Sequence, residues 1–275
     1  MILDTISKAT RIRVEKAKEQ LSLEELKERI YGGEELKNPR GREAFAFERA
    51  LRKNINRLED GKKISVICEV KKASPSKGVI TDNFPYLAIA KEYVEAGASA
   101  ISVLTEPEFF RGDNRYLIEI SEEVPIPVLR KDFTIDEYQI YEAKLLGADA
   151  VLLICSLLDT QTIHRYLDLC DQLGLSALVE THSEPEILSA IQAGARVIGV
   201  NNRDLKTFEV DIANSIRLRE FVPMDVIFVA ESGIQSPRDI TRLWEAGVDA
   251  VLIGEMLMRS HNKKEALTKL LSQVL

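Results

Sequence analysis

A glutamate and a lysine follow a short apolar run near residue 67, where the sequence reads ICEVKKASPSKG. Glu69 and Lys71 would supply a carboxylate and an ammonium group at the end of a predicted buried strand, just before a turn. This is a common way to aim reactive groups into a pocket from a rigid base. An exposed ion pair at a strand end explains the stretch alone equally well, so the rest of the chain must decide.

Polar side chains follow other apolar runs of the chain in the same way. They are Lys131, Glu180, Asn201, Arg203, Glu231 and Glu255. A single charged residue at the end of a strand is usually solvated and has no function. Several lysines and glutamates that converge on one concave surface are hard to explain in that way, and they indicate a functional site.

A phosphate site is predicted beside these residues. Ser232 and Gly233 follow one apolar run, and Gly254 follows the next. Glycine lets backbone N–H groups approach phosphate oxygens, and a short helix that begins near Glu255 would add a favourable dipole. Both glycines could be simple turn residues, but two neighbouring loops that share the feature favour phosphate binding.

Several other chemistries lack their sequence signals. The chain has no GxGxxG, GxxxxGK[ST], GxSxG or HExxH pattern, and it contains three histidines. Nucleotide, nucleophile-elbow and histidine-metal chemistry are therefore not indicated, and no metal is expected. Ser74 and Ser76 have no histidine at a predicted strand end and are not interpreted as nucleophiles. A Schiff base at Lys131 remains open on chemical grounds.

The composition is that of a globular protein without a nucleic-acid footprint. The 275 residues are 45% hydrophobic and 29% charged, with a net charge of −7. Nucleic-acid binding would need a clustered basic face, whereas a local lysine cluster can still attract an anionic substrate. No apolar segment resembles a signal peptide or a membrane span. The cysteines have no metal or disulfide spacing and are expected to be reduced thiols of a cytoplasmic protein: Cys68, Cys155 and Cys170.

Eight short apolar runs alternate with eight helical patterns from residue 64 onward. The predicted strands are 64–70, 99–104, 127–130, 149–154, 175–180, 196–200, 225–230 and 249–253. The predicted helices are 84–96, 114–122, 136–146, 159–173, 183–193, 211–220, 235–246 and 263–273. An open doubly wound sheet can be built from such units, but eight of them in roughly 210 residues favour a closed (β/α)8 TIM barrel.

The first part of the chain has a different composition: it is rich in charged residues and poor in residues that favour strands. Residues 1–60 are predicted to be an N-terminal helical extension, and residues 61–275 the barrel, within a single structural domain. Ser22 and Glu25 fit a capping box, and an amphipathic helical pattern follows at 47–58. We expect the extension to pack on the barrel and to help close the site.

Four motifs at the ends of predicted strands carry a resemblance to a known family. They are Glu69 to Gly78, Leu129 to Phe133, Gly199 to Leu205 and Ala230 to Gly233. With these motifs in this order, nearly the whole chain resembles indole-3-glycerol phosphate synthase. The resemblance implies a carboxy-lyase of tryptophan biosynthesis without a cofactor. It would close 1-(2-carboxyphenylamino)-1-deoxyribulose 5-phosphate to indole-3-glycerol phosphate, with loss of CO₂ and water.

The resemblance also implies catalytic roles. Lys131 matches the general acid that protonates the ketone oxygen of the substrate, and Glu180 the base of the later dehydration. Lys71 pairs with the substrate carboxylate or takes part in acid catalysis, and Glu69 orients the lysines. Burial and a second lysine lower the pKa of such a lysine, whereas nearby glutamates oppose that shift. Two positions expected to hydrogen-bond around the reacting atoms are Asn201 and Glu231.

Substrate-binding positions follow from the same resemblance. Those near the phosphate are Ser232, Gly233, Gly254 and the neighbourhood of Lys71, and Arg203 lies near the anthranilate carboxylate. Those of the aromatic pocket are Pro75, Phe133, Leu152 and Leu205, with Ser74, Ser76, Leu252 and Glu255 completing the wall. Leu152 could equally be barrel core. Glu255 departs from members that have serine there, and we expect its carboxylate to point away and only its backbone N–H to be offered.

Two other readings compete with this one. Another phosphate-binding barrel, such as the preceding isomerase or the tryptophan synthase α subunit, would use a Cys/Asp or Glu/Asp acid–base pair. A barrel that only binds a phosphorylated ligand would tolerate loss of the acid and the base, yet these positions are filled here. The expected partner is a small phosphorylated molecule, with no nucleic acid or membrane, and the chain is expected to be a monomer, with a homodimer as the alternative.

Overall fold

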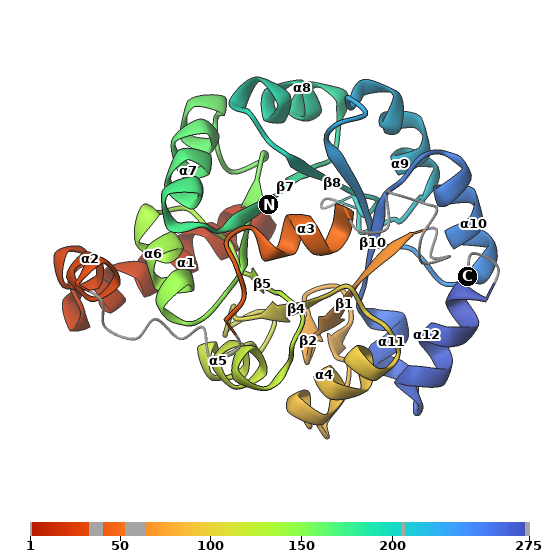
Figure 1. Cartoon of the computed structure of the whole chain (residues 1–275), viewed down its shortest axis with the longest axis horizontal. Helices are drawn as coiled ribbons and strands as arrows, with labels where there is room; N and C mark the ends of the chain where they lie inside the picture. Colours follow the sequence, from red (N-terminus) through yellow and green to blue (C-terminus); the bar gives the residue numbers. More distant parts are fainter. Residues whose placement is uncertain (1, 33–40, 53–63, 205–206, 273–275) are drawn as a thin grey trace.

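A closed barrel of parallel strands forms the body of the molecule (Figure 1). The computed structural model describes residues 2–32, 41–52, 64–204 and 207–272. Within these ranges, eight strands pair side by side, and the last pairs with the first. They are β1 (Ser65–Val70), β4 (Ala100–Leu104), β5 (Val128–Lys131), β6 (Ala150–Ile154), β7 (Ser176–Thr181), β8 (Val197–Asn201), β9 (Ile227–Glu231) and β10 (Ala250–Ile253). The predicted (β/α)8 barrel is confirmed.

Helices surround the barrel as predicted. They are α4 (Tyr86–Glu95), α5 (Asn114–Glu123), α6 (Glu137–Leu145), α7 (Thr160–Leu173), α8 (Glu184–Ala193), α9 (Ala213–Leu218), α10 (Pro237–Glu245) and α12 (Lys263–Leu271). A 3-10 turn, Arg219–Phe221, extends α9, and the short α11 (Glu255–Arg259) follows β10. The sequence did not predict the small hairpin of β2 (Ala73–Ser74) and β3 (Gly78–Val79), which lies in the loop after β1.

The strands are buried on both faces because each separates two apolar layers. Ile67 and Leu129 point into the barrel, while Val66 and Cys68 of β1 point outward and pack under the helices. This alternation follows from the two-residue period of a strand. Continuous apolar strands are therefore required here, and polar residues collect at the strand ends.

The N-terminal extension contacts both ends of the barrel. It consists of α1 (Ile2–Gln20), α2 (Leu23–Tyr31), which begins with the predicted Ser22–Glu25 capping box, and α3 (Ala46–Arg52). In Figure 1, α3 lies across the end of the barrel that faces the viewer. The other end is the mouth, where α1 lines the cavity described below. The predicted division at residue 60 falls outside the described residues and stays a prediction.

Helix α3 closes the floor of the barrel. Phe47 and Leu51 are fully buried and pack against Ile67 and Leu129 inside the ring of strands. The later part of the predicted helix at 47–58 lies outside the described residues. Apolar side chains from the extension thus complete the core that the strands begin.

Two smaller expectations concern thiols and membranes. The three cysteines are free thiols; Cys68 and Cys170 are buried, and Cys155 is half-buried. In the described part of the chain, no helix has the length and apolar character needed to cross a membrane.

Candidate active site

The predicted site residues come together around one cavity of about 620 Å³ at the carboxyl ends of the strands. The polar ones on its wall are Glu69, Lys71, Ser74, Ser76, Lys131, Glu180, Asn201, Arg203, Glu231, Ser232 and Glu255. The others are Pro75, Phe133, Leu152, Leu252, Gly233 and Gly254. Leu205 lies outside the described residues. Strand ends far apart in sequence thus share one mouth, as the barrel topology requires.

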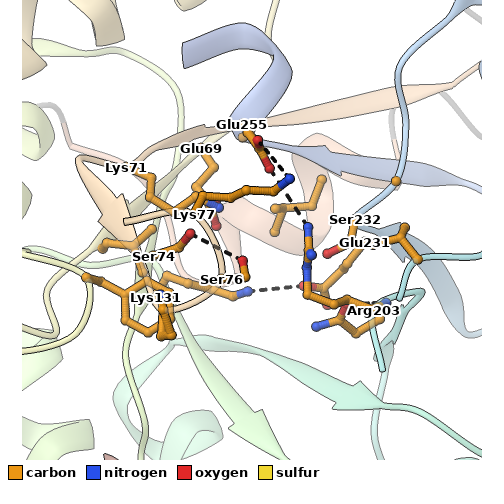
Figure 2. A pocket seen from close by; sticks show the side chains of 18 of the residues that line it. Glu69, Lys71, Ser74, Ser76, Lys77, Lys131, Arg203, Glu231, Ser232 and Glu255 are labelled. Carbon is orange, nitrogen blue, oxygen red and sulfur yellow. Dashed lines mark hydrogen bonds and ion pairs between the residues drawn. The ribbon is translucent and has the colours of Figure 1, made fainter. Parts of the chain in front are cut away.

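Lys131 lies within reach of two carboxylates, Glu231 and Glu180, and its contact with Glu231 is drawn in Figure 2. Its Nζ is 3.2 Å from Oε2 of Glu231 and 3.5 Å from Oε2 of Glu180. Burial favours the neutral amine, but the attraction of Glu231, Glu180 and Glu69 prevails, and the pKa of Lys131 is raised above its ordinary value. Of the two opposing effects expected from the sequence, attraction by the glutamates is therefore the stronger. Lys131 is an ammonium group at neutral pH.

The pKa of Glu231 lies well above the ordinary value of a carboxylate. Burial raises its pKa to about 7, with a further contribution from Glu180, while Lys131 acts in the opposite direction. Gly199 on the adjacent strand makes room for this side chain, because a Cβ there would collide with Oε1 of Glu231. The sequence did not single out Gly199 for this role, although it begins the motif that contains Asn201.

Glu69 and Lys71 form a second ion pair, at the carboxyl end of β1. Lys71 Nζ donates a short hydrogen bond to Oε1 of Glu69, and both side chains are largely buried. Burial acts to raise the pKa of Glu69, but Lys71 and Lys131 outweigh it and lower that pKa. Gly254 packs against this pair, where a Cβ would collide with the Glu69 carboxylate.

Asn201 connects Glu180 to the loop after β8. Its Nδ2 donates to Oε1 of Glu180 at 3.3 Å, and its Oδ1 accepts from the backbone N–H of Arg203 at 3.0 Å. The Arg203 guanidinium in turn donates to the carbonyl of Phe208 at 3.2 Å. The amide thus orients one carboxylate oxygen of Glu180 and leaves the other facing Lys131.

The loop predicted to hold phosphate has an unusual backbone. Ser232 has φ of 68° and Gly233 has φ of 85°, both in the left-handed region. That conformation is strained for serine, and strained residues cluster at ligand sites. The short helix expected after Gly254 is present as α11.

Glu255 does not point away from the cavity, so that expectation was wrong. Its carboxylate lies between Lys77 and Arg203 at 3.8 and 3.9 Å, and Oε1 accepts from Nε of Arg259 at 3.1 Å (Figure 2). Three cations from different loops attract one anion, and this attraction brings the carboxylate over the mouth. The sequence analysis identified Arg203 and Glu255 as site residues, but it did not identify Lys77 and Arg259.

The sequence analysis also did not identify several apolar residues that line the cavity. Phe110 faces Phe133 with ring centroids 5.9 Å apart, and Ile2, Leu3 and Ile6 reach the cavity from α1. Phe110 lies six residues after the end of β4, in a loop that the sequence analysis did not single out although it contains Glu106 and Glu108. Residues of α1 carry no local signal, because their position depends on how the extension docks.

An ion pair anchors α1 directly beside Lys131. Arg13 donates two hydrogen bonds to Asp132, at 2.9 and 2.6 Å, and Asp132 also accepts from Thr105 at 2.7 Å. Asp132 follows Lys131 in sequence and is almost fully buried. The position of α1 and the end of β5 are therefore fixed together.

The fold and the site define a (β/α)8-barrel enzyme with lysine–glutamate acid–base groups at its mouth. The family model described as indole-3-glycerol phosphate synthase matches residues 3–270. Curated proteins named indole-3-glycerol phosphate synthase are similar over nearly their whole length. One from Ruminiclostridium cellulolyticum is 57% identical, covering 98% of each chain, and one from Lachnoclostridium phytofermentans is 52% identical, covering 96% of each. The chain belongs to the indole-3-glycerol phosphate synthase family, whose members are carboxy-lyases of tryptophan biosynthesis.

Solved structures with low sequence identity share the fold. The 3-hexulose-6-phosphate synthase of Salmonella typhimurium superposes with a TM-score of 0.62 at 17% identity, over 77% of this chain and 98% of that one. A thiamine phosphate pyrophosphorylase of Pyrococcus furiosus gives a TM-score of 0.58 at 18% identity, over 79% of this chain and all of that one. These likenesses concern the barrel alone.

Proposed function

We propose that this cavity converts 1-(2-carboxyphenylamino)-1-deoxyribulose 5-phosphate to indole-3-glycerol phosphate by lysine–glutamate acid–base catalysis. One observation carries the proposal: the Lys131 ammonium group lies within reach of two carboxylates, at 3.2 and 3.5 Å, on the wall of a cavity large enough for such a substrate. The acid and the base thus come from different strands and face the same space. Family membership supports the choice of substrate.

The proposed steps follow from these positions. Lys131 donates a proton to the ketone oxygen, which makes that carbon electrophilic for attack by the aromatic ring. Loss of CO₂ restores the aromatic system. The hydroxyl group formed from the ketone then takes a second proton from an ammonium group of the mouth and leaves as water, while Glu180 accepts the proton lost from the adjacent carbon. A Schiff base at Lys131 would need the neutral amine, which its raised pKa disfavours.

Lys71 and the apolar wall have supporting roles in this proposal. Lys71, held by Glu69, supplies a positive charge for the substrate carboxylate, and Phe110 with Phe133 contacts the aromatic ring. Water excluded from the mouth would strengthen each of these charge interactions. Two partly buried ammonium groups on one wall thus suit a substrate with two anionic groups.

The decisive assay incubates the purified protein with the ribulotide and follows indole fluorescence, without added metal or cofactor. We expect product formation to saturate with substrate concentration. Folded protein that forms no indole product under these conditions would refute the proposed function.

The phosphate is proposed to bind between the loops after β9 and β10. Backbone N–H groups of Ser232, Gly233 and the start of α11 are available there, and Lys77 and Arg203 lie across the same part of the cavity. The Glu255 carboxylate occupies the space between these two cations. Phosphate and Glu255 would therefore compete for the same positive charge.

Glu255→Gln is expected to tighten the binding of a phosphate group. A like charge about 4 Å away in a hydrated site is worth about 1 kcal/mol, so inorganic phosphate should inhibit about fivefold more strongly. Inhibition constants of both proteins measure the change. Glu245→Gln, which removes the same charge from the exposed end of α10, is the control. Equal inhibition of the wild-type and Glu255→Gln proteins would contradict competition at this position.

Arg13→Gln is expected to lower kcat/KM about tenfold, because it releases α1 from Asp132 beside the acid, and small displacements of catalytic groups are costly. Steady-state kinetics measure the effect. Arg11→Gln, on the exposed face of the same helix, should leave the kinetics unchanged. Wild-type kinetics in both variants would show that this contact does not serve the site.

The location of the protein in the cell and its oligomeric state are part of the proposal. We propose that the enzyme works in the cytoplasm, which the free thiols of its buried cysteines support. A monomer is proposed, since every residue used in the proposed steps comes from one chain. Its partner is the small phosphorylated substrate, and the net charge of −7 gives no support for nucleic-acid binding.

A further inference from the structure

His182 lies immediately behind the proposed base. It follows the end of β7, two residues after Glu180, at the turn into α8, and its side chain is only 18% exposed. It does not line the cavity, so it has no access to the substrate. An ionisable ring in such a place can act on the reaction only through its neighbours.

Two carboxylates face this ring from opposite sides. Nε2 of His182 is 3.6 Å from Oε1 of Glu180, and Nδ1 is 3.5 Å from Oε2 of Glu186 on α8. Within the described residues, both ring nitrogens are buried and have no closer hydrogen-bond partner. The imidazole is therefore placed to bridge the two acids as a cation.

Glu186 is a fixed anchor for this bridge. It accepts hydrogen bonds from Oγ of Ser156 and from the backbone N–H of His182, both at 2.6 Å. Burial acts to raise the pKa of Glu186, but the contacts with His182 and Ser156 prevail and lower it. An ionised carboxylate is thus held against one nitrogen of the ring.

None of the other described groups around His182 opposes its charged form. Glu231 on β9 attracts the ring in its ionised form, which its pKa of about 7 makes partial at neutral pH. Cys155 after β6 is neutral, because burial, Glu186 and Glu180 raise its pKa to about 12. Asn214 of α9 is neutral as well. Burial acts to lower the pKa of His182, but Glu186, Glu180 and Glu231 outweigh it and raise that pKa above 6.5. The charge balance therefore favours the cationic form of this ring.

We propose that His182 is a positioning residue for Glu180, bridging it to Glu186 and holding positive charge behind it. Asn201 and the His182 ring both contact Oε1 of Glu180. The other oxygen, Oε2, is therefore directed toward Lys131 and the substrate. The inference rests on the proposed role of Glu180 as base. His182 transfers no proton to the substrate and acts only through the orientation and charge of that carboxylate.

The kinetic test compares His182→Gln with His164→Gln. His164 is the matched control, because its side chain is 61% exposed on α7 and pairs with Asp168 one turn away. We expect His182→Gln to lower kcat about 10- to 100-fold, with KM within about twofold, since misplacing a catalytic group mainly affects the reacting step. His164→Gln should match the wild type. If His182→Gln also matches it, the proposal is wrong.

The charge is tested by histidine ring NMR. The chain has three histidines, so His164→Gln, His182→Gln and His261→Gln assign all signals. We expect His182 to titrate above pH 6.5 and Glu186→Gln to lower that midpoint. The kcat–pH profile should contain an inflection at this pH, retained in His164→Gln and lost in His182→Gln. Titration of His182 at or below 6.5, or identical profiles, would overturn the proposal.

Two further outcomes are an unfolded His182→Gln variant and an inactive wild-type protein. If His182→Gln does not fold, Glu186→Gln replaces it in the kinetic test, with the same expected loss of kcat and the same refuting result. If the wild-type protein forms no indole product, the proposed function fails, whereas the NMR titration still decides whether the ring between Glu180 and Glu186 carries a charge.

Discussion

Lys131→Ala is expected to lower kcat about 10²–10⁴-fold, the usual contribution of a positioned acid, with a much smaller change in KM. The lysine is the only ammonium group within 4 Å of both Glu180 and Glu231 among the described residues. Its removal eliminates the proposed proton donor and leaves the two carboxylates without the positive charge between them. Steady-state kinetics by indole fluorescence measure the change.

Lys72→Ala is the control for this experiment. Lys72 follows Lys71 in the same charged loop but does not line the cavity, so its loss removes one positive charge without touching the site. Circular dichroism should give the same spectrum for both variants. An unchanged kcat in folded Lys131→Ala would remove this residue from the role of general acid.

Phe47→Ala is expected to lower the free energy of unfolding by about 3–5 kcal/mol, the range for a large aromatic residue removed from a packed core. Phe47 is fully buried in the floor of the barrel, where rigid strands surround it and cannot collapse into the space. Urea denaturation followed by circular dichroism measures the loss. The cavity lies at the opposite end, so the KM of the folded protein should change little.

Ile12→Ala provides the comparison within the same extension. Its side chain is 59% exposed, and such surface changes usually alter stability by less than about 0.5 kcal/mol. A loss below about 1 kcal/mol for Phe47→Ala would mean that α3 is not part of the cooperative core. A similar loss in both variants would point to a general sensitivity of the extension.

The barrel and most of its mouth were predictable because both follow from short-range rules. Apolar runs that alternate with helical patterns fix the order of strands, and the glycines before the strands have the left-handed conformation that such turns need, as Gly97 and Gly194 show. Once the strands are parallel, their carboxyl ends must meet. The convergence of Glu69, Lys131 and Glu180 therefore follows from topology.

What was not predictable depends on contacts between distant segments. The orientation of Glu255 is determined by Lys77, Arg203 and Arg259 together, and local sequence cannot show that they surround one point. The raised pKa of Lys131 depends on a balance between burial and attraction, which only distances decide. The hairpin after β1 has strands of two residues, too short for any periodic pattern.

The helix at the floor of the barrel has a consequence for the order of folding. Helix α3 contacts β1, β4, β7 and β9, so strands from both halves of the chain must be in place before Phe47 and Leu51 are buried. Contacts between residues far apart in sequence slow folding, because chain entropy is lost before they form. One of the first segments to be synthesised is thus among the last to be packed. A ribosome-bound chain that lacks β9 would still expose this apolar surface, and exposed apolar surface makes a folding intermediate prone to aggregation.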